Sequence, residues 1–471
     1  MYDVLVIGAG IIGTTVSREL SRYELSVLCV EKMGDFSCGV TKANSGIVHA
    51  GHDAVPGSKK AIHNVRGNAL YEKWSRELDF PFKKNGSLVL YHDESEYPLV
   101  EELYMRGEKN GVTDMELIGE ERLYELEPNL KHSAKGALWL KTGGITCPFE
   151  FAIAAAENAE HNGVGIKCLT EVEGIERKNG YYSVSTSSGV FEARAVVNAA
   201  GLWSDDVNNM VCTEKLNIIP RRGQYIMMDN TMGATFTRTL FNVPGKMGKG
   251  ILISPTTDGN LFLGPTAEDV PGKNDTETTA EGLFDIAEKT LVNWDFPRDH
   301  YITQFSGIRP HLESGDFVIG QCADGFFNAC GIESPGLTAA PSIAETLSSE
   351  VASYLGASKK TDFDPIRKAI PRFKKMTDEE RREAIARDPR YSHVLCRCEQ
   401  VTEAEIVDAV RRGARTMDAV KRRTRAGMGK CQRGFCGPET LTIIARELGI
   451  SRDEVLTNEP GTEVLTGRIG K

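Results

Sequence analysis

The sequence has no apolar run long enough to cross a membrane and no excess of positive charge. A transmembrane helix needs roughly 18 or more consecutive apolar residues, and no stretch of this 471-residue chain provides them. The formal net charge is −10, which argues against general nucleic-acid binding, because phosphate backbones attract basic surfaces. The chain opens on a strand-like segment rather than on a basic and then apolar signal peptide. These absences predict a cytoplasmic protein, associated with a membrane only if a partner carries it there, and the length of 471 residues predicts two or three domains.

The sequence also lacks the cysteine pattern of a disulfide-linked protein. It has 11 cysteines, an odd number, and all but four are scattered singly through apolar or helical segments. Such spacing suits a reducing compartment better than a set of structural disulfides. The other four are grouped in two close pairs near the C-terminus, where they form a separate signal.

The strongest positive signal lies in the first 31 residues. Residues 1–7 (MYDVLVI) are apolar and typical of a buried strand, and the glycine-rich stretch GAGIIG follows at once. We expect a helix over 14–23 and a second strand over 25–30, which ends at the acidic residue Glu31. This order of strand, tight turn, helix, strand and acid is the pattern of a dinucleotide-binding unit, with an ordinary strand–helix turn as the alternative.

Each glycine of the turn has a physical role in that prediction. Gly8 permits the tight turn, Gly10 lets the backbone approach a pyrophosphate, and Gly13 lets the helix pack closely against the strand. The helix N-terminus offers N–H groups and a positive dipole end to the phosphates. Glu31 can accept hydrogen bonds from ribose hydroxyls.

A polar loop follows, with Lys42, Asn44, Ser45, His49 and His52 close together. Small residues beside these polar ones indicate a backbone that passes close to a ligand. A surface loop with incidental polar residues is the alternative.

Residues 42–70 (KANSGIVHAGHDAVPGSKKAIHNVRGNAL) resemble the flavin-contacting segment of the D-amino-acid-oxidase-like flavoproteins. Within them, the resemblance is to the glycerol-3-phosphate dehydrogenase and L-2-hydroxyglutarate dehydrogenase branch. Residues 196–207 (VVNAAGLWSDDV) are similar to its second FAD motif, and 307–310 (GIRP) and 331–344 (GIESPGLTAAPSIA) to the segments around the flavin ring. The strand-like segments RRGQYIMMD and LFLGPTAEDV resemble strands of its substrate domain.

This resemblance implies an α/β fold, in which a Rossmann-like FAD-binding domain carries an inserted α+β substrate domain. The FAD-binding domain is expected at 1–75, 151–212 and 315–355, and the substrate domain at 76–150 and 213–314. The residues expected to contact FAD are Gly8, Gly10, Ile12, Gly13, Glu31, Lys32, Lys42, Asn44, Ser45, Gly46, Val172, Ala200, Gly201, Trp203, Gly307, Arg309, Gly336, Leu337 and Thr338.

Basic residues of the middle of the chain are candidates for holding a small anionic substrate. Arg309 lies in a predicted turn, and an arginine fork suits a carboxylate or phosphate. Arg221, Arg222, Lys246 and Lys249 are further candidates. A surface ion pair for Arg309 and a solvated basic loop for the others are the alternatives.

One position departs from the hydroxyglutarate branch. The resemblance implies a histidine in the strand just before the turn at 255–259, whereas this chain has Leu252 there. The departure weakens a hydroxyglutarate substrate and leaves His49 or His52 as the expected proton acceptor.

The four grouped cysteines predict a metal or iron–sulfur site. They are Cys396 and Cys398, spaced C-x-C, and Cys431 and Cys436, spaced C-x4-C, with two short helices expected between the pairs around Gly413. The arrangement resembles the bacterioferritin-associated-ferredoxin-like domain, which implies a 2Fe–2S cluster in a small helical module at 393–471, after a linker and helix at 356–392. Zinc or unligated cysteines are the alternatives.

The basic segment between the cysteine pairs has two further interpretations. Residues 408–433 contain nine basic and two acidic residues. A positive field there would help keep the cluster reducible or dock an acidic partner, and a solvated helix face is the alternative.

The flavoprotein resemblance, with Leu252 in place of the expected histidine, implies an FAD-dependent dehydrogenase that oxidises sn-glycerol 3-phosphate to dihydroxyacetone phosphate. His49 or His52 would take the hydroxyl proton and Arg309 would hold the anionic end. Electrons would leave through the cluster to a partner flavoprotein or quinone-linked subunit, since an oxidase needs no such exit. The alternatives are an L-2-hydroxy-acid or amino-acid dehydrogenase and, in another class, an electron-transfer subunit without a substrate of its own.

Overall fold

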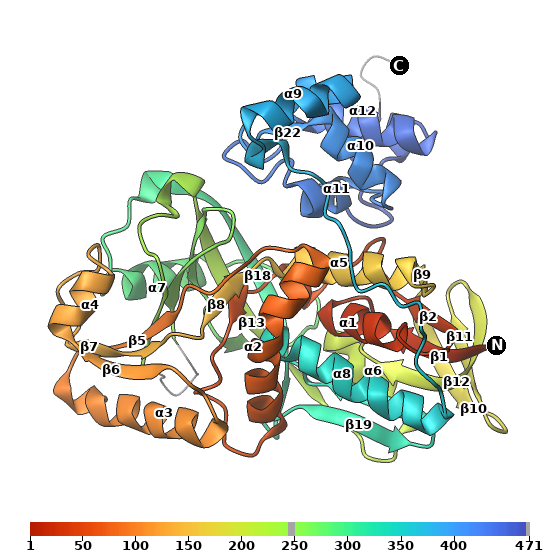
Figure 1. Ribbon diagram of the computed structural model, residues 1–471, viewed down its shortest axis with the longest axis horizontal. Helices are drawn as coiled ribbons and strands as arrows, with labels where there is room; N and C mark the ends of the chain where they lie inside the picture. Colours follow the sequence, from red (N-terminus) through yellow and green to blue (C-terminus); the bar gives the residue numbers. More distant parts are fainter. Residues whose placement is uncertain (244–249, 468–471) are drawn as a thin grey trace.

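The computed structural model describes residues 1–243 and 250–467. Figure 1 shows two sheet-containing bodies side by side and a small helical module above them. One body holds an eight-stranded sheet and the other a nine-stranded sheet. This mixed α/β architecture confirms the predicted fold class.

The eight-stranded sheet has a parallel centre in the order β9-β2-β1-β12-β20, extended by β10, β11 and β19. Its strands are β1 (Tyr2–Ile7), β2 (Val27–Val30), β9 (Gly165–Lys167), β10 (Val172–Arg177), β11 (Tyr182–Thr186), β12 (Gly189–Asn198), β19 (Val318–Ala323) and β20 (Phe326–Cys330). The carboxyl ends of parallel strands meet at one edge, which is where such sheets bind ligands.

The nine-stranded sheet is mostly antiparallel, and its longest pairing joins β13 to β18. Its strands are β5 (Ser87–Tyr91), β6 (Met115–Gly119), β7 (Gly136–Leu140), β13 (Ile218–Met228), β14 (Thr239–Asn242), β15 (Leu252–Pro255), β16 (Leu261–Gly264), β17 (Glu268–Asp269) and β18 (Tyr301–Leu312). A three-stranded sheet joins β3 (Ile47–Val48), β4 (Phe82–Lys83) and β8 (Gly144–Thr146). The two large sheets thus draw on alternating parts of the chain, while the domain boundaries themselves stay a prediction.

Burial on both faces explains the apolar run at residues 4–7 of β1. Val4 and Val6 face a core shared with four helices, whereas Leu5 and Ile7 face a second core on the opposite side of the sheet. Successive side chains of a strand point to opposite faces, so a strand covered on both faces is apolar throughout.

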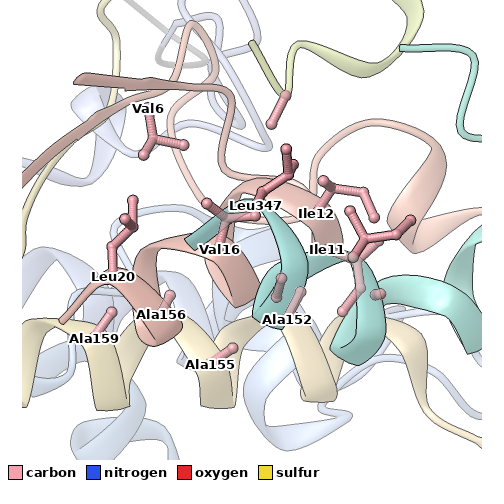
Figure 2. Close-up of a cluster of buried hydrophobic side chains, with 14 of the residues drawn as sticks. Val6, Ile11, Ile12, Val16, Leu20, Ala152, Ala155, Ala156, Ala159 and Leu347 are labelled. Carbon is pink, nitrogen blue, oxygen red and sulfur yellow. The ribbon is translucent and has the colours of Figure 1, made fainter. Parts of the chain in front are cut away.

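Helix α1 (Ile11–Leu20) packs against α5 (Pro148–His161) and α8 (Gly336–Leu355). Figure 2 shows Val16 and Leu20 of α1 beside Ala152, Ala156 and other alanines of α5. The short alanine side chains let the two helix backbones approach closely. The helix was predicted over 14–23. It begins three residues earlier, at Ile11, because Gly10 is the last residue of the turn with extended backbone geometry.

The remaining helices of the two large bodies lie around these sheets (Figure 1). They are α2 (Lys59–Leu78), α3 (Tyr97–Asn110), α4 (Glu120–Leu126), α6 (Ser204–Val211) and α7 (Ala280–Thr290). No helix within residues 1–243 and 250–467 is both long and apolar enough to span a bilayer.

The small module has its own apolar core, in which Ile406, Val420 and Ile444 are fully buried. It contains α10 (Glu403–Arg411), α11 (Met417–Thr424) and α12 (Gly437–Leu448), with the short pair β21 (Val394–Cys396) and β22 (Val401–Thr402), and α9 (Asp378–Arg387) precedes it. The two helices expected around Gly413 are confirmed as α10 and α11, and Gly413 has the left-handed φ of 96° that favours glycine between them.

Two of the scattered cysteines are joined, which the sequence did not predict. Cys212 after α6 and Cys322 in β19 form a disulfide between segments 110 residues apart. Sequence spacing could not reveal this pair, because only the fold brings the two segments together.

Candidate active site and cofactor sites

A cavity of about 2200 Å³ is lined by residues of both large sheets. It begins at the carboxyl ends of β1 and β2 and continues past the loop after β2 to the surfaces of β13 and β18. Most of the residues predicted to contact FAD line it: Gly8, Gly10, Ile12, Glu31, Lys32, Lys42, Asn44, Ser45, Val172, Ala200, Gly201, Trp203, Gly307, Arg309, Gly336 and Leu337.

The glycine turn has the geometry required for a dinucleotide. Gly8 has a φ of 101°, and a Cβ on it would lie 2.5 Å from the carbonyl oxygen of Ala199. A Cβ on Gly13 would lie 1.7 Å from the carbonyl oxygen of Gly8, so only glycine allows α1 to pack this close to the strand. Gly10 lines the cavity and gives α1 no side-chain cap, so the helix N-terminus opens on the cavity.

Glu31 stands at the same end of the cavity. Its Oε2 accepts a hydrogen bond from the N–H of Ala9 at 2.7 Å, and its Oε1 accepts one from the N–H of Met33 at 2.9 Å. Burial raises the pKa of this carboxyl, and the two N–H donors oppose the shift. Each oxygen keeps a lone pair, so the fixed carboxylate is able to accept ribose hydroxyls.

Three residues predicted to contact FAD do not line the cavity, but they fix the packing and the backbone around it. Gly13 is the packing glycine of α1. Gly46 has a φ of 65°, and a Cβ there would lie 2.5 Å from the carbonyl oxygen of Thr146. Thr338, in the first turn of α8, holds the backbone of His49.

Strands β13 and β18 present matched pairs of residues to the cavity. Their antiparallel register places Arg221 opposite Arg309, Gly223 opposite Gly307, and Tyr225 opposite Phe305. Alternate residues of a strand share a face, so these six residues lie on one side of the pair. Except for Gly223, all of them line the cavity.

The two glycines make room on this face. A Cβ on Gly307 would lie 2.0 Å from the carbonyl oxygen of Ala43, where the loop after β2 crosses the strand. A Cβ on Gly223 would lie 2.3 Å from the Arg309 guanidinium. Arg309 lies within β18 and not in the predicted turn. It is fixed there by donating from Nη2 to the carbonyl oxygen of Thr266 at 2.9 Å.

Arg222 is not at the cavity, contrary to the prediction. As the neighbour of Arg221 it points to the opposite face of β13, where it is 7% exposed. Its guanidinium donates to Glu268 at 2.9 Å and to Asp275 at 2.6 Å. Lys246 and Lys249, also substrate candidates, lie outside the described residues.

His49 follows β3 and lines the cavity, with its backbone held on both sides. Its N–H donates to Thr338 Oγ1 at 2.9 Å. Its carbonyl oxygen accepts from Nδ2 of Asn64 at 3.3 Å and of Asn68 at 3.1 Å, both on α2. The imidazole Nε2 lies 3.4 Å from Ser334 Oγ.

His52 lies elsewhere, although it is only three residues away. It is 5% exposed, is not part of the cavity lining, and packs near Gly107 of α3. The structure therefore separates the two histidines that the sequence left as alternatives.

Several cavity residues were missed from the sequence. Tyr225 stacks on Phe305 with ring centroids 4.8 Å apart, and its hydroxyl lies 3.2 Å from Ser45 Oγ. Glu333 lines the cavity between Lys60 and His311, at 2.8 and 2.9 Å. The period-2 pattern of RRGQY places Tyr225 on the same face as Arg221, so identifying one of them as a cavity residue would have identified the other.

The four C-terminal cysteines come together in two pairs. Cys398 Sγ lies 3.8 Å from Cys431 Sγ, and Cys396 and Cys436 are hydrogen-bonded to each other, which lowers the pKa of Cys396 and raises that of Cys436. Thiolates are the form that binds metals. This donor set fits a cluster ligated by four thiolates, those of Cys396, Cys398, Cys431 and Cys436.

Buried ion pairs hold the small helical module against the body that contains the eight-stranded sheet, where FAD is predicted to bind. Arg422 and Arg423 of α11 donate to Asp35 at 2.7 and 2.8 Å, and all three side chains are at most 5% exposed. Burial alone would raise the pKa of Asp35, but the two guanidinium groups hold it below its usual value.

A second contact joins the module to the other body. Arg425 donates to Asp258 and to Glu399, both at 3.0 Å. The most basic part of segment 408–433 is thus used for internal packing, and neither a free positive field nor a solvated helix face describes it.

Comparisons with known proteins agree with this geometry. The family model "FAD dependent oxidoreductase" matches residues 3–350, and the model "BFD-like [2Fe-2S] binding domain" matches residues 394–446. The chain is 46% identical over 480 residues to the glycerol 3-phosphate dehydrogenase of Caloramator mitchellensis, a match that covers 99% of this chain and 98% of that one.

Two more distant similarities cover less of the chain. It is 31% identical over 278 residues to the mitochondrial L-2-hydroxyglutarate dehydrogenase of Caenorhabditis briggsae, covering 56% of this chain and 63% of that one. The solved structure of dithionite-reduced L-alpha-glycerophosphate oxidase from Mycoplasma pneumoniae, with FAD bound, matches with a TM-score of 0.74 and 29% identity, over 78% of this chain and 98% of that one.

The family model spans well over half of the chain, and it includes both large sheets and the glycine turn. The turn, the fixed Glu31 carboxylate and the long cavity are the features that the cofactor requires. The chain therefore belongs to the FAD-dependent oxidoreductase family, with FAD as its cofactor, and carries a BFD-like 2Fe–2S domain after the flavin-binding part.

Proposed function

We propose that this protein oxidises sn-glycerol 3-phosphate to dihydroxyacetone phosphate. The observation that carries the proposal is the 46% identity to a glycerol 3-phosphate dehydrogenase, because it extends over both the flavin-binding part and the 2Fe–2S domain. Bound FAD supplies a hydride acceptor. The residues of this chain bind the substrate, orient it and remove its proton.

His49 is the proton acceptor in this proposal. It lines the cavity, and hydrogen bonds to its backbone N–H and carbonyl oxygen fix its position. The imidazole takes the hydroxyl proton of the substrate while the hydride leaves the carbon that bears this hydroxyl. No negative charge then builds up on the alcohol oxygen. Leu252 and Phe241 provide an apolar wall that excludes water, and Leu252 is 4% exposed.

Arg309 holds the phosphate. Its Nη2 is anchored on the carbonyl oxygen of Thr266, and its remaining N–H groups are available to an anion in the cavity. Arg221 lies directly opposite and pairs with Asp269 at 2.6 Å. Asp269 partly compensates the charge of this second guanidinium, so Arg309 is the main phosphate ligand in the proposal.

Electrons leave through the cluster to a partner protein. Oxidation of an alcohol releases two electrons together, whereas a 2Fe–2S cluster carries one at a time, so the cluster serves as an outlet rather than as part of the alcohol chemistry. The partner is an electron-accepting flavoprotein or a quinone-linked subunit, through which the protein would reach a membrane.

The test is anaerobic reduction of the flavin by candidate substrates. Glycerol 3-phosphate should bleach the flavin absorbance much faster than L-2-hydroxyglutarate or an amino acid does. Arg309→Lys keeps the charge but loses the fork, and it should raise KM or lower kcat/KM. Faster reduction by L-2-hydroxyglutarate would replace the proposed substrate, and no reduction by any of them would favour an electron-transfer subunit.

A further inference from the structure

A tight turn near the C-terminal end of the described chain is built around one threonine. We call residues 457–462 the C-terminal turn. The N–H of Thr457 donates to the carbonyl oxygen of Thr462 at 2.7 Å. The Thr462 hydroxyl accepts from the N–H groups of Asn458 and Glu459 at 3.1 and 3.0 Å. These bonds fix the backbone on which the Asn458 and Glu459 side chains stand.

The C-terminal turn is also fixed to the 2Fe–2S domain. The N–H of Met417 donates to the carbonyl oxygen of Leu456 at 3.0 Å, and that of Asp418 to the carbonyl oxygen of Thr457 at 2.9 Å. Both donors belong to the first turn of α11, the helix whose Arg422 and Arg423 pair with Asp35. The turn is therefore held at a defined place beside the loop that follows Glu31.

The turn reaches the wall of the FAD cavity. Asn458 and Glu459 line the same cavity as Glu31 and Lys32. The backbone oxygen of Asn458 lies so close to Gly34 that a Cβ there would be 3.2 Å away. Burial lowers the pKa of Lys32, and the nearby carboxylates, Glu459 among them, oppose the shift.

We propose that the C-terminal turn is part of the FAD site, where Asn458 and Glu459 close the end that holds the adenosine. The amide and carboxylate match the hydroxyl and amino groups of adenosine, which donate and accept hydrogen bonds. The carboxylate would repel the pyrophosphate, which belongs instead at the glycine turn. Neither residue falls within the matched flavin region at 3–350 or the matched cluster region at 394–446. The 2Fe–2S domain thereby helps to retain the flavin.

The test uses the full-length protein with both cofactors. The double substitution Asn458→Ala, Glu459→Ala removes both polar side chains and leaves the backbone bonds to Thr462. FAD release is followed by the recovery of flavin fluorescence after dilution. Each lost hydrogen bond should speed release about three- to tenfold. The visible spectrum of the cluster shows whether the domain stays folded.

The matched control is Glu463→Ala, which removes an exposed acid one residue beyond the turn. It should leave FAD release unchanged. Amide hydrogen exchange gives a second readout: the N–H groups of 457–462 should exchange faster after FAD is removed. The proposal is overturned if the double variant releases FAD at the unaltered rate, or if Glu463→Ala speeds release equally.

Discussion

Single residues shape this site largely by the space they leave. A side chain on Gly13, Gly223 or Gly307 would collide with a backbone oxygen or with the Arg309 guanidinium. The glycines of the first turn were predicted from the sequence because they have the G-x-G-x-x-G spacing of a dinucleotide-binding turn. Gly223 was not, because its importance depends on the register between β13 and β18, which brings Arg309 beside it.

Gly10 gives the most direct test of the FAD site. A Cβ on it would lie 3.3 Å from Thr41 Oγ1, which is tolerable, but the branches of a valine would enter the cavity where the pyrophosphate must pass. Gly10→Val should therefore yield protein without flavin, measured by absorbance after purification. Gly174→Val is the control, since nothing lies within 4 Å of a Cβ there. Full flavin content in Gly10→Val would contradict the assignment.

A second prediction distinguishes the role of His49 from that of His52. His49→Gln should lower the rate of anaerobic flavin reduction by glycerol 3-phosphate about 10²- to 10⁴-fold, because the hydroxyl proton loses its acceptor. His52→Gln, outside the cavity lining, should reduce its flavin at close to the unaltered rate. Stopped-flow absorbance measures both. A larger loss in the His52 variant would reverse the assignment.

Arg222 shows why single-residue predictions failed where the fold class did not. Both Arg221 and Arg222 suit an anion by chemistry, and only the direction of the side chain decides between them. That direction follows from the pleat once the strand is known to face a cavity on one side. The pattern of the sequence predicts the alternation but not which face is which.

At the scale of elements, helix α11 is the one whose observed role differs most from the predicted role. Its basic residues predicted an external function, but Arg422 and Arg423 are buried on Asp35, which lies nearly 390 positions away in the chain. A pairing over such a distance leaves no local pattern. The helix itself, by contrast, was predicted, as one of the two short helices around Gly413.

This contact predicts a stability effect. Asp35→Asn would leave two guanidinium groups buried without a counter-charge and should lower the free energy of unfolding by about 3–5 kcal/mol, measured by denaturant titration. Glu125→Gln, which breaks the exposed pair with Arg122, should cost about 1 kcal/mol or less. Equal losses in the two variants would show that the buried contact contributes no more to the free energy of unfolding than the exposed pair does.

The same pair sets a pH dependence of known sign. The pKa of Asp35 is lowered in the folded protein, so its stabilisation is complete above the usual value of 3.8 and is lost as the pH falls through the lowered pKa. The difference in stability between the unaltered protein and Asp35→Asn should be constant near neutral pH and shrink below about pH 4. A difference that grew on acidification would refute this linkage.

At the scale of the whole molecule, the 2Fe–2S domain contacts both large bodies. Arg423 pairs with Asp35 of the FAD-binding body, and Arg425 pairs with Asp258 beside β15 of the other. The domain is therefore fixed relative to the cavity rather than tethered by a loose linker (Figure 1). A fixed position suits the proposed electron path, in which the cluster receives electrons from the flavin.

The last prediction separates the alcohol chemistry from the electron exit. Cys398 is an exposed cysteine, paired with Cys431 and placed away from the apolar core of the domain. Cys398→Ser should disrupt the cluster, visible as a loss of the electron paramagnetic resonance signal after dithionite reduction. Anaerobic flavin reduction by substrate should continue, because none of the four cysteines lines the cavity. Turnover with a one-electron acceptor should collapse, since the reduced flavin has lost its outlet. Cys168→Ser, a change at a half-buried cysteine outside the cluster, should leave the signal and the turnover intact. Zinc in the unaltered protein, with no paramagnetic signal, would make the site structural, and the proposed exit would then have to be abandoned.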